Sequence, residues 1–201
     1  MAFSHVGGGV NDALIVTVLA AIGFVSIVVA LVGGPPSPST VTRAAILFMA
    51  PLYLGLPLGV LAMIRGTRGP AALSWLIIVI AASDSAQYYA GRTFGRRKLA
   101  PLVSPAKTVE GAIGGLVAAV AIGTALGWWG VAGEQPVIVG VLAFVLAAGG
   151  MVGDLFESLL KRSAGVKDSA SLIPGHGGIL DRIDSYLVAA PLYYLYLALR
   201  G

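Results

Sequence analysis

Residues 13–33 read ALIVTVLAAIGFVSIVVALVG, and no charged residue stands anywhere between Asp12 and Arg43. A helix needs about 20 predominantly apolar residues to cross the hydrocarbon core of a bilayer, and this run supplies them. The run is too long for the core of a signal peptide and lacks a basic flank. We therefore interpret it as a membrane-spanning helix.

Further segments along the chain have the same apolar character. They are Ala44–Ile64, Pro70–Ala90, Gly111–Trp129, Gln135–Lys161 and Ile183–Leu199. Pro51 and Pro57 should kink the first of these, because proline cannot complete the helical hydrogen-bond ladder. Glycine and alanine in Gly111–Trp129 allow close helix packing. The sequence thus predicts an all-α fold, a polytopic membrane bundle of about six transmembrane helices.

The composition agrees with a membrane protein. Hydrophobic residues make up 57% of the 201 residues and charged residues 11%, whereas soluble domains carry about 25% charged residues. This excludes a soluble enzyme and a disordered chain. The absence of cysteine and the presence of only two histidines exclude disulfides, thiolate zinc sites and histidine-rich metal sites. Any metal would be held by carboxylates, which suits hard cations such as Mg²⁺.

The basic residues are distributed unequally over the two sides that six spans define. One side carries ten: Arg43, Arg92, Arg96, Arg97, Lys98, Lys107, Lys161, Arg162, Lys167 and Arg182. The other carries three: Arg65, Arg68 and Arg200. The positive-inside rule places the side with ten in the cytoplasm. We expect N-terminal transmembrane helices over 1–69 and a catalytic transmembrane domain over 70–201, with cytoplasmic loops at 91–110 and 158–182.

Five of the nine carboxylates fall within residues 154–184. Asp154, Glu157 and Lys161 lie on one face at helical spacing, and Asp154 follows 19 uncharged residues, so it should lie near the membrane boundary. Asp181 and Asp184 stand three residues apart where the last span begins. Such a pair can form a cation site or cap the helix.

Other polar features also allow a functional or a structural interpretation. Glycines around His176 form a turn whose backbone N–H groups could approach a phosphate, or a plain loop. The stretch SPAKTVEG, Ser104–Gly111, offers Lys107 to a phosphate or caps a helix. Asp84 lies within an apolar segment, where a carboxylate is costly, so it is a site candidate unless it pairs with Arg92.

Together these residues combine carboxylates for a divalent cation with basic side chains for a polyphosphate. The basic residues are Lys107, Lys161, Arg162, Lys167 and Arg182. Their location at the cytoplasmic face of a membrane bundle indicates phosphoryl or nucleotidyl transfer between a cytosolic nucleotide and a membrane lipid.

Three stretches resemble a known family. Residues 158–184 read SLLKR, four residues, then KDSASLIPGHGGILDRID, which resembles the signature of phosphatidate cytidylyltransferases, the CDP-diacylglycerol synthases. SPAKTVEG resembles the family element SPKKTxEG, and DSAQYYAGRTFG at 84–95 resembles D-x-x-A-Y-x-x-G-x-x-F-G. Ala106 and Gln87 depart from these patterns, in place of lysine and alanine. Family members typically have additional N-terminal spans, which leaves open whether this is a compact member.

The resemblance implies a reaction in which CTP and phosphatidate give CDP-diacylglycerol and pyrophosphate, with Mg²⁺ and a nearby monovalent cation such as K⁺. It implies Asp154, Asp181 and Asp184 as metal ligands. The implied catalytic residues are Asp154, Asp181, Lys161 and Arg182. The implied substrate contacts are Ser104, Lys107, Arg162, Lys167, His176, Gly177, Gly178 and Asp84.

The resemblance further implies a homodimer in the cytoplasmic (inner) membrane, and no nucleic-acid partner is expected. Alternatives are a CTP-dependent lipid-alcohol kinase and a cytidylyltransferase for another lipid phosphate, such as an archaeal ether lipid. A transporter is a weaker alternative, because only Asp84 lies deep in a span and the other carboxylates cluster at one face.

Overall fold

The computed structural model describes residues 8–33, 37–170 and 178–200, with side chains from Thr17 onward. The chain divides into two compact units, Met1–Leu56 and Pro57–Gly201. The division predicted from sequence lies later, between residues 69 and 70.

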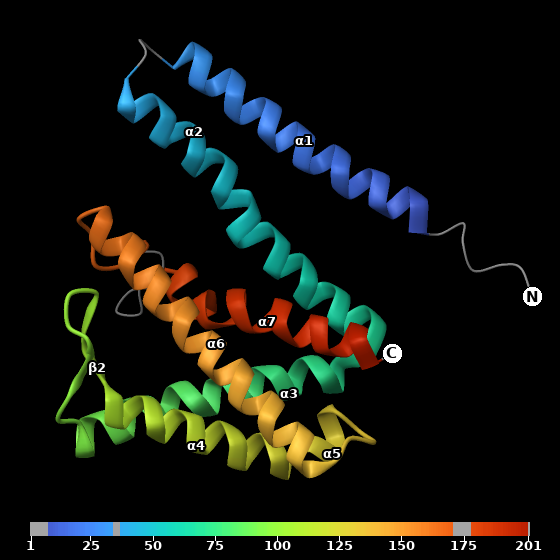
Figure 1. Cartoon of the computed structure of the whole chain (residues 1–201), viewed down its shortest axis with the longest axis vertical. Coiled ribbons are helices and arrows are strands. Elements are labelled where there is room, and N and C mark those ends of the chain that lie inside the picture. Colours follow the sequence, from blue (N-terminus) through green and yellow to red (C-terminus); the bar gives the residue numbers. More distant parts are fainter. Residues whose placement is uncertain (1–7, 34–36, 171–177, 201) are drawn as a thin grey trace, which may run out of the picture. The chain divides into compact units, whose positions relative to one another are not determined.

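The first unit is a helical pair, α1 (Gly8–Val32) and α2 (Pro38–Ala50), which run side by side (Figure 1). The Ser37 side chain caps α2 by accepting a hydrogen bond from the Thr40 N–H at 3.3 Å. Pro38 occupies the first turn, where a missing N–H is harmless. A π-helical turn, η1 (Pro51–Gly55), follows α2 directly. The expected irregularity at Pro51 is thus a π-helical turn, in which the backbone continues without a break.

Helix α3 (Leu56–Phe94) contains a break at Gly69, whose φ of 83° and ψ of 176° are not helical. Glycine reaches positive φ without steric cost, and Pro70 disfavours the helical conformation for the residue before it. The break falls between the second and third predicted spans.

The remaining helices of the second unit are α4 (Val109–Ala125), the short α5 (Gly127–Gly130), α6 (Pro136–Ser163) and α7 (Leu180–Arg200). All predicted apolar segments are therefore helical. Helices α6 and α7 extend into both ends of the predicted loop 158–182.

Helices α3, α4, α6 and α7 enclose one core in the second unit. Trp75 is fully buried and donates from Nε1 to the Gly123 carbonyl at 3.0 Å. A Cβ atom at Gly123 would lie 2.5 Å from the Ala143 Cβ atom, so this crossing requires glycine. The expected close packing of the glycine-rich segment is confirmed.

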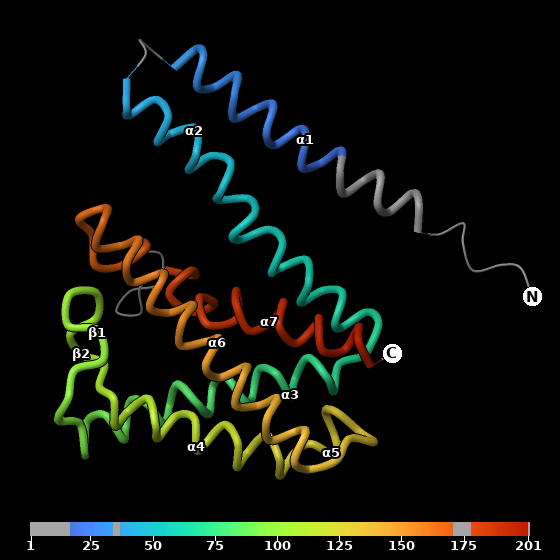
Figure 2. Tube along the Cα trace, viewed as in Figure 1, coloured from blue at the N-terminus to red at the C-terminus, as the bar shows by residue number. Residues whose placement is uncertain are grey.

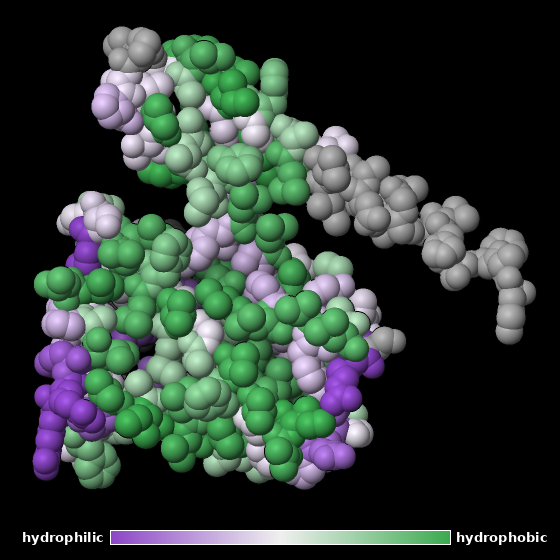
Figure 3. Space-filling view, viewed as in Figure 1, coloured by the Kyte–Doolittle hydropathy of each residue, from purple (hydrophilic) through white to green (hydrophobic). Residues whose placement is uncertain are grey.

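Apolar side chains also cover much of the face of the second unit that Figure 3 shows. Hydrophilic residues gather at its two ends, with a hydrophobic band between them. Within the described residues, the helical run Pro38–Phe94 and the helix Pro136–Ser163 are long and apolar enough to cross a membrane. An apolar exterior over an apolar core is typical of a protein solvated by lipid.

The predicted loop 91–110 contains a β-hairpin, so the all-α expectation needs correction here. Strand β1 (Lys98–Ala100) pairs antiparallel with β2 (Ser104–Thr108), with Lys98 opposite Thr108. Figure 2 shows the hairpin between the end of α3 and the start of α4. Strand β1 has only three residues, and the sequence SPAKT of β2 does not alternate between apolar and polar residues, so hydrophobic periodicity does not reveal the hairpin.

Candidate functional site

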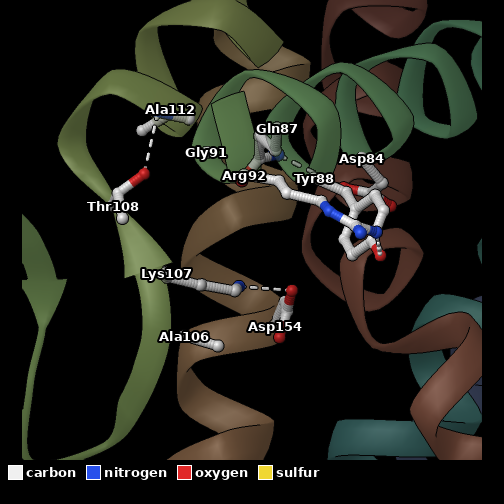
Figure 4. A pocket seen from close by; sticks show the side chains of 11 residues that line it. Asp84, Gln87, Tyr88, Gly91, Arg92, Ala106, Lys107, Thr108, Ala112 and Asp154 are labelled. Carbon is white, nitrogen blue, oxygen red and sulfur yellow. Dashed lines mark hydrogen bonds and ion pairs between the residues drawn. The ribbon is translucent and has the colours of Figure 1, made fainter. Parts of the chain in front are cut away.

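A pocket of about 390 Å³, with both charged and apolar groups in its lining, lies where α3, β2, α4 and α6 meet (Figure 4). Lys107 of β2 and Asp154 of α6 form an ion pair in it. Both side chains are partly buried, with exposed fractions of 19% and 29%. The pocket is lined by Asp84, Gln87, Tyr88, Gly91, Arg92, Ala106, Lys107, Thr108, Gly111, Ala112 and Asp154. Three predicted site residues from separate segments, Asp84, Lys107 and Asp154, thus line one cavity.

The local structure of SPAKTVEG explains how Lys107 is placed. Thr108 is the N-cap of α4, and its hydroxyl accepts from the Gly111 N–H at 3.1 Å. Glu110 accepts from the N–H groups of Arg96 and Arg97 at 3.0 and 3.1 Å. Helix capping by Thr108 is therefore confirmed, and Lys107 lines the pocket, whereas its contact with a phosphate stays a prediction.

Asp84 is held from two helices. Its Oδ1 accepts from Gln87 Nε2 at 3.3 Å, and its Oδ2 accepts from the Ser185 hydroxyl of α7 at 3.4 Å. It also interacts electrostatically with Asp154 and Lys107. Arg92, the alternative partner considered from sequence, donates to the Tyr88 hydroxyl at 3.2 Å instead. Asp84 thus faces the charged pocket, as expected for a carboxylate in an apolar helix.

A second charged cluster joins α6 to the start of α7. Lys161 forms an ion pair with Glu157 and donates to Asp181 Oδ1 at 2.6 Å. The other Asp181 oxygen accepts from the Ser169 N–H at 3.1 Å, the Ser169 hydroxyl at 2.8 Å and the Gly178 N–H at 2.7 Å. Burial alone would raise the pKa of the Asp181 carboxyl, but Lys161 and the donors of Gly178 and Ser169 outweigh it and hold that pKa well below its usual range.

Asp184 follows Asp181 on α7 and is buried. Its Oδ1 accepts from the Ser185 N–H at 2.7 Å, and it interacts electrostatically with Asp154, Glu157 and Asp84. Asp154 and Asp181, which were expected to share a metal ion, belong to different ion pairs in this structure. Their metal role stays a prediction.

The fit to a metal ion depends on the number of carboxylates that approach one another. No group of three or more histidines or carboxylates among the described residues is arranged to hold a metal ion. Mg²⁺, however, usually binds one or two carboxylates together with substrate phosphates. The pocket carboxylates Asp84 and Asp154 are therefore chemically suitable ligands for such an ion.

The other predicted contacts surround the two clusters. Ser104 is half-buried in β2 opposite Ala100. Arg162 and Lys167 are exposed, and Arg162 donates to the Val166 carbonyl at 2.9 Å. Arg182 is exposed in the first turn of α7. Gly178 donates to Asp181, whereas His176 and Gly177 lie outside the described residues.

Sequence reasoning missed several residues of the pocket and the second cluster. Gln87 and Ala106, the two residues that depart from the family patterns, both line the pocket. Their departure from those patterns was the signal in the sequence that could have added them to the predicted site. Glu157 was placed on one face with Lys161, but its complete burial depends on packing that the spacing does not show.

Comparisons with known proteins agree with this picture. The model of a cytidylyltransferase family matches residues 2–200. Phosphatidate cytidylyltransferase of Haemophilus influenzae is 45% identical over 139 residues, covering 64% of this chain and 46% of the relative. That of Brucella suis is 44% identical over 153 residues, covering 72% and 54%. That of Bacillus subtilis is 38% identical over 162 residues, covering 80% and 60%.

The chain therefore spans about half the length of these relatives. A solved structure of an intramembrane enzyme for archaeal membrane lipid biosynthesis matches weakly, with a TM-score of 0.44 and 23% identity over 60% of this chain and 77% of that one. The apolar helices and the relatives make this a helical membrane protein, and the chain belongs to the cytidylyltransferase family.

Proposed function

We propose that this chain transfers a cytidylyl group from CTP to phosphatidate and releases pyrophosphate. The observation that carries the proposal is the Lys107–Asp154 ion pair inside a pocket of an otherwise apolar helical unit. The relatives named phosphatidate cytidylyltransferase support the choice of reaction.

The reaction requires few chemical groups from the protein. The phosphate of phosphatidate has a second pKa of about 6 and is largely dianionic at neutral pH. Its oxygen attacks the α-phosphorus of CTP, and the bond from that phosphorus to the bridging oxygen of the β-phosphate breaks, so pyrophosphate leaves with the electron pair. No protein base is needed. The protein must instead align two anions and neutralise their repulsion.

The pocket residues suit this task. Lys107 supplies a positive charge inside the cavity, and Arg92 supplies another in its lining. The hydroxyl of Tyr88 already accepts a hydrogen bond from Arg92, which orients the guanidinium. A partly buried positive charge such as Lys107 interacts with phosphate more strongly than it does in bulk water.

We further propose that Mg²⁺ serves this site, with Asp154 as its first ligand. Asp84, Asp154 and Asp184 interact electrostatically as like charges, and a cation between them would relieve that repulsion. When bound, Mg²⁺ would neutralise phosphate charge. Asp181 and Asp184 remain expected ligands from the sequence, and K⁺ is a proposal from the family resemblance.

The proposed topology has six spans, with the pocket on the cytoplasmic side of the inner membrane. The spans would lie within α1, the helical run up to Gly69, the rest of α3, α4, α6 and α7, and the ends of α6 and α7 that carry Lys161 and Asp181 would lie outside the membrane. The basic residues of the β-hairpin region support this orientation through the positive-inside rule. A homodimer is proposed from the family resemblance.

The test is a reaction of the detergent-solubilised protein with phosphatidate, Mg²⁺ and CTP labelled either in the base or in the γ-phosphate. We expect the base label in the lipid product and the γ label in pyrophosphate. Transfer of only the γ label to lipid would show a kinase and overturn the proposal. Lys107→Met should reduce the rate, whereas Lys98→Met, an exposed lysine of the same hairpin, should not.

A further inference from the structure

Glu157 is a charged residue that the proposed chemistry does not use, and it is one of the most buried side chains of the chain. Its exposed fraction is 0%. Removing a carboxylate from water costs several kcal/mol unless a partner compensates it. Its ionic partner is Lys161, one helical turn later on α6. Such a buried pair needs an explanation in terms of what it holds in place.

Lys161 is bound on both sides by carboxylates. It forms an ion pair with Glu157 and donates to Asp181 Oδ1 at 2.6 Å, and only 15% of its side chain is exposed. One ammonium between two carboxylates leaves a net charge of minus one. Lys161 is therefore already neutralised by the protein in this structure, and its predicted contact with a triphosphate stays a prediction.

Asp181 connects the Glu157–Lys161 pair to the backbone at Ser169 and Gly178. Its second oxygen accepts from the N–H and hydroxyl of Ser169 and from the Gly178 N–H. Ser169 and Gly178 also lie against each other, since a Cβ atom at Gly178 would collide with Ser169 Oγ. The Asp181 carboxylate thus joins Ser169 and Gly178, which are nine residues apart in sequence. Its other oxygen binds Lys161 of α6.

We propose that Glu157 is a positioning residue: it anchors Lys161, Lys161 orients Asp181, and Asp181 holds Ser169 together with Gly178. This inference adds a positioning residue to the proposed function, and its kinetic test rests on that function. Without the Glu157 charge, Lys161 keeps one anchor, and its flexible chain can turn toward solvent. Asp181 then loses its ionic partner, and the two backbone N–H groups lose a fixed acceptor.

The test compares Glu157→Gln with the intact protein, because the substitution keeps the size of the side chain and removes its charge. We expect hydrogen exchange at the Ser169 and Gly178 amides to accelerate by about tenfold or more, which corresponds to about 1.4 kcal/mol. We expect kcat to fall by about tenfold or more, with KM for CTP changing less than about threefold. Glu157→Asp keeps the charge and should restore part of both losses.

Two further variants separate positioning from general stability. Ser158→Ala removes the neighbouring buried hydroxyl and should leave exchange and kcat unchanged. Lys161→Met should reproduce the exchange defect of Glu157→Gln, and the double variant should be no worse than Lys161→Met alone, because residues that act through one contact are not additive.

Two results would overturn the proposal. One is unchanged exchange at Ser169 and Gly178 in Glu157→Gln. The other is a uniform rise in exchange over all helices, matched by an equal loss of thermal stability, which would make Glu157 a structural residue only. If Glu157→Gln does not fold, the same two criteria apply to Lys161→Met, which removes the same ion pair. If the intact protein makes no CDP-diacylglycerol, the proposed function fails, and exchange alone decides the role of Glu157.

Discussion

Lys107 and Lys161 both form ion pairs with carboxylates of α6 or α7, but their surroundings in the folded protein differ. Lys107 has one carboxylate partner, Asp154, and borders an open cavity. Lys161 has two partners, Glu157 and Asp181, and Asp181 is itself bound by Ser169 and Gly178. The first arrangement can exchange its partner for a ligand, whereas the second is already saturated. The two lysines thus differ in their access to a cavity and in the number of carboxylates around them, since both are paired with a carboxylate.

The largest expected effect comes from the saturated cluster. Asp181→Asn should lower turnover by about a thousandfold, equivalent to about 4 kcal/mol, and should also destabilise the fold by about 2 kcal/mol because hydrogen bonds to a charged group are lost. Rates over a Mg²⁺ titration and thermal unfolding measure the two losses. Asp168→Asn, an exposed carboxylate nearby, is the matched control. More than about a tenth of the normal rate, a loss below about 1.4 kcal/mol, would remove Asp181 from the catalytic residues.

The open pair should respond differently. Asp154→Asn should lower turnover by about a hundredfold, or about 2.7 kcal/mol, and raise the Mg²⁺ concentration needed for half the maximal rate. Its loss of thermal stability should be smaller than that of Asp181→Asn, because Asp154 has a single ionic partner. Equal destabilisation by the two substitutions would contradict the distinction between an open and a saturated pair.

The pH dependence of stability offers a third comparison. The pKa of Asp181 lies below its usual value, so its ionised form stabilises the fold above the unfolded pKa of about 3.9, and this contribution is lost as the pH falls below it. The stability difference between the intact protein and Asp181→Asn should be constant from about pH 7 to 5 and should narrow below about pH 4. Unfolding curves across this range test it, and a gap that widens on acidification would refute the assignment.

The smallest effect is expected at the base of the hairpin that carries Lys107. The N–H groups of Arg96 and Arg97 bind Glu110 and lower its pKa to about 2. Glu110→Gln should accelerate exchange at these two amides by about two- to fivefold and change turnover less than Asp154→Asn does. Peptide-level exchange and steady-state rates are the measurements. A loss of turnover as large as that of Asp154→Asn would mean that the hairpin, and not the ion pair, controls the pocket.

Much of the helical architecture could be predicted because its causes are local. Every long apolar segment is helical, and the break between the second and third segments falls at Gly69 before Pro70. Thr108 caps α4, which was one of the two interpretations of its stretch. The hairpin at Lys98–Thr108 was not predicted, since its strands of three and five residues are stabilised by pairing with each other and by Glu110.

The candidate site could be predicted in its residues but not in its pairings. Asp84, Lys107 and Asp154 were selected as charges in or beside apolar segments, and they line one pocket. Gln87 and Glu157 were not selected as site residues, because an amide and an i,i+4 partner of a lysine are ordinary features of a helix surface.

The sequence by itself determined that this chain forms apolar helices with its carboxylates gathered near the last two, because hydropathy and helical spacing are sums over neighbouring residues. Only the tertiary structure decided that Lys107 pairs with Asp154 while Lys161 is enclosed by Glu157 and Asp181. The physical reason is that the strength of a charge pair depends on separation and burial, and both arise when α6 packs against β2 and α7.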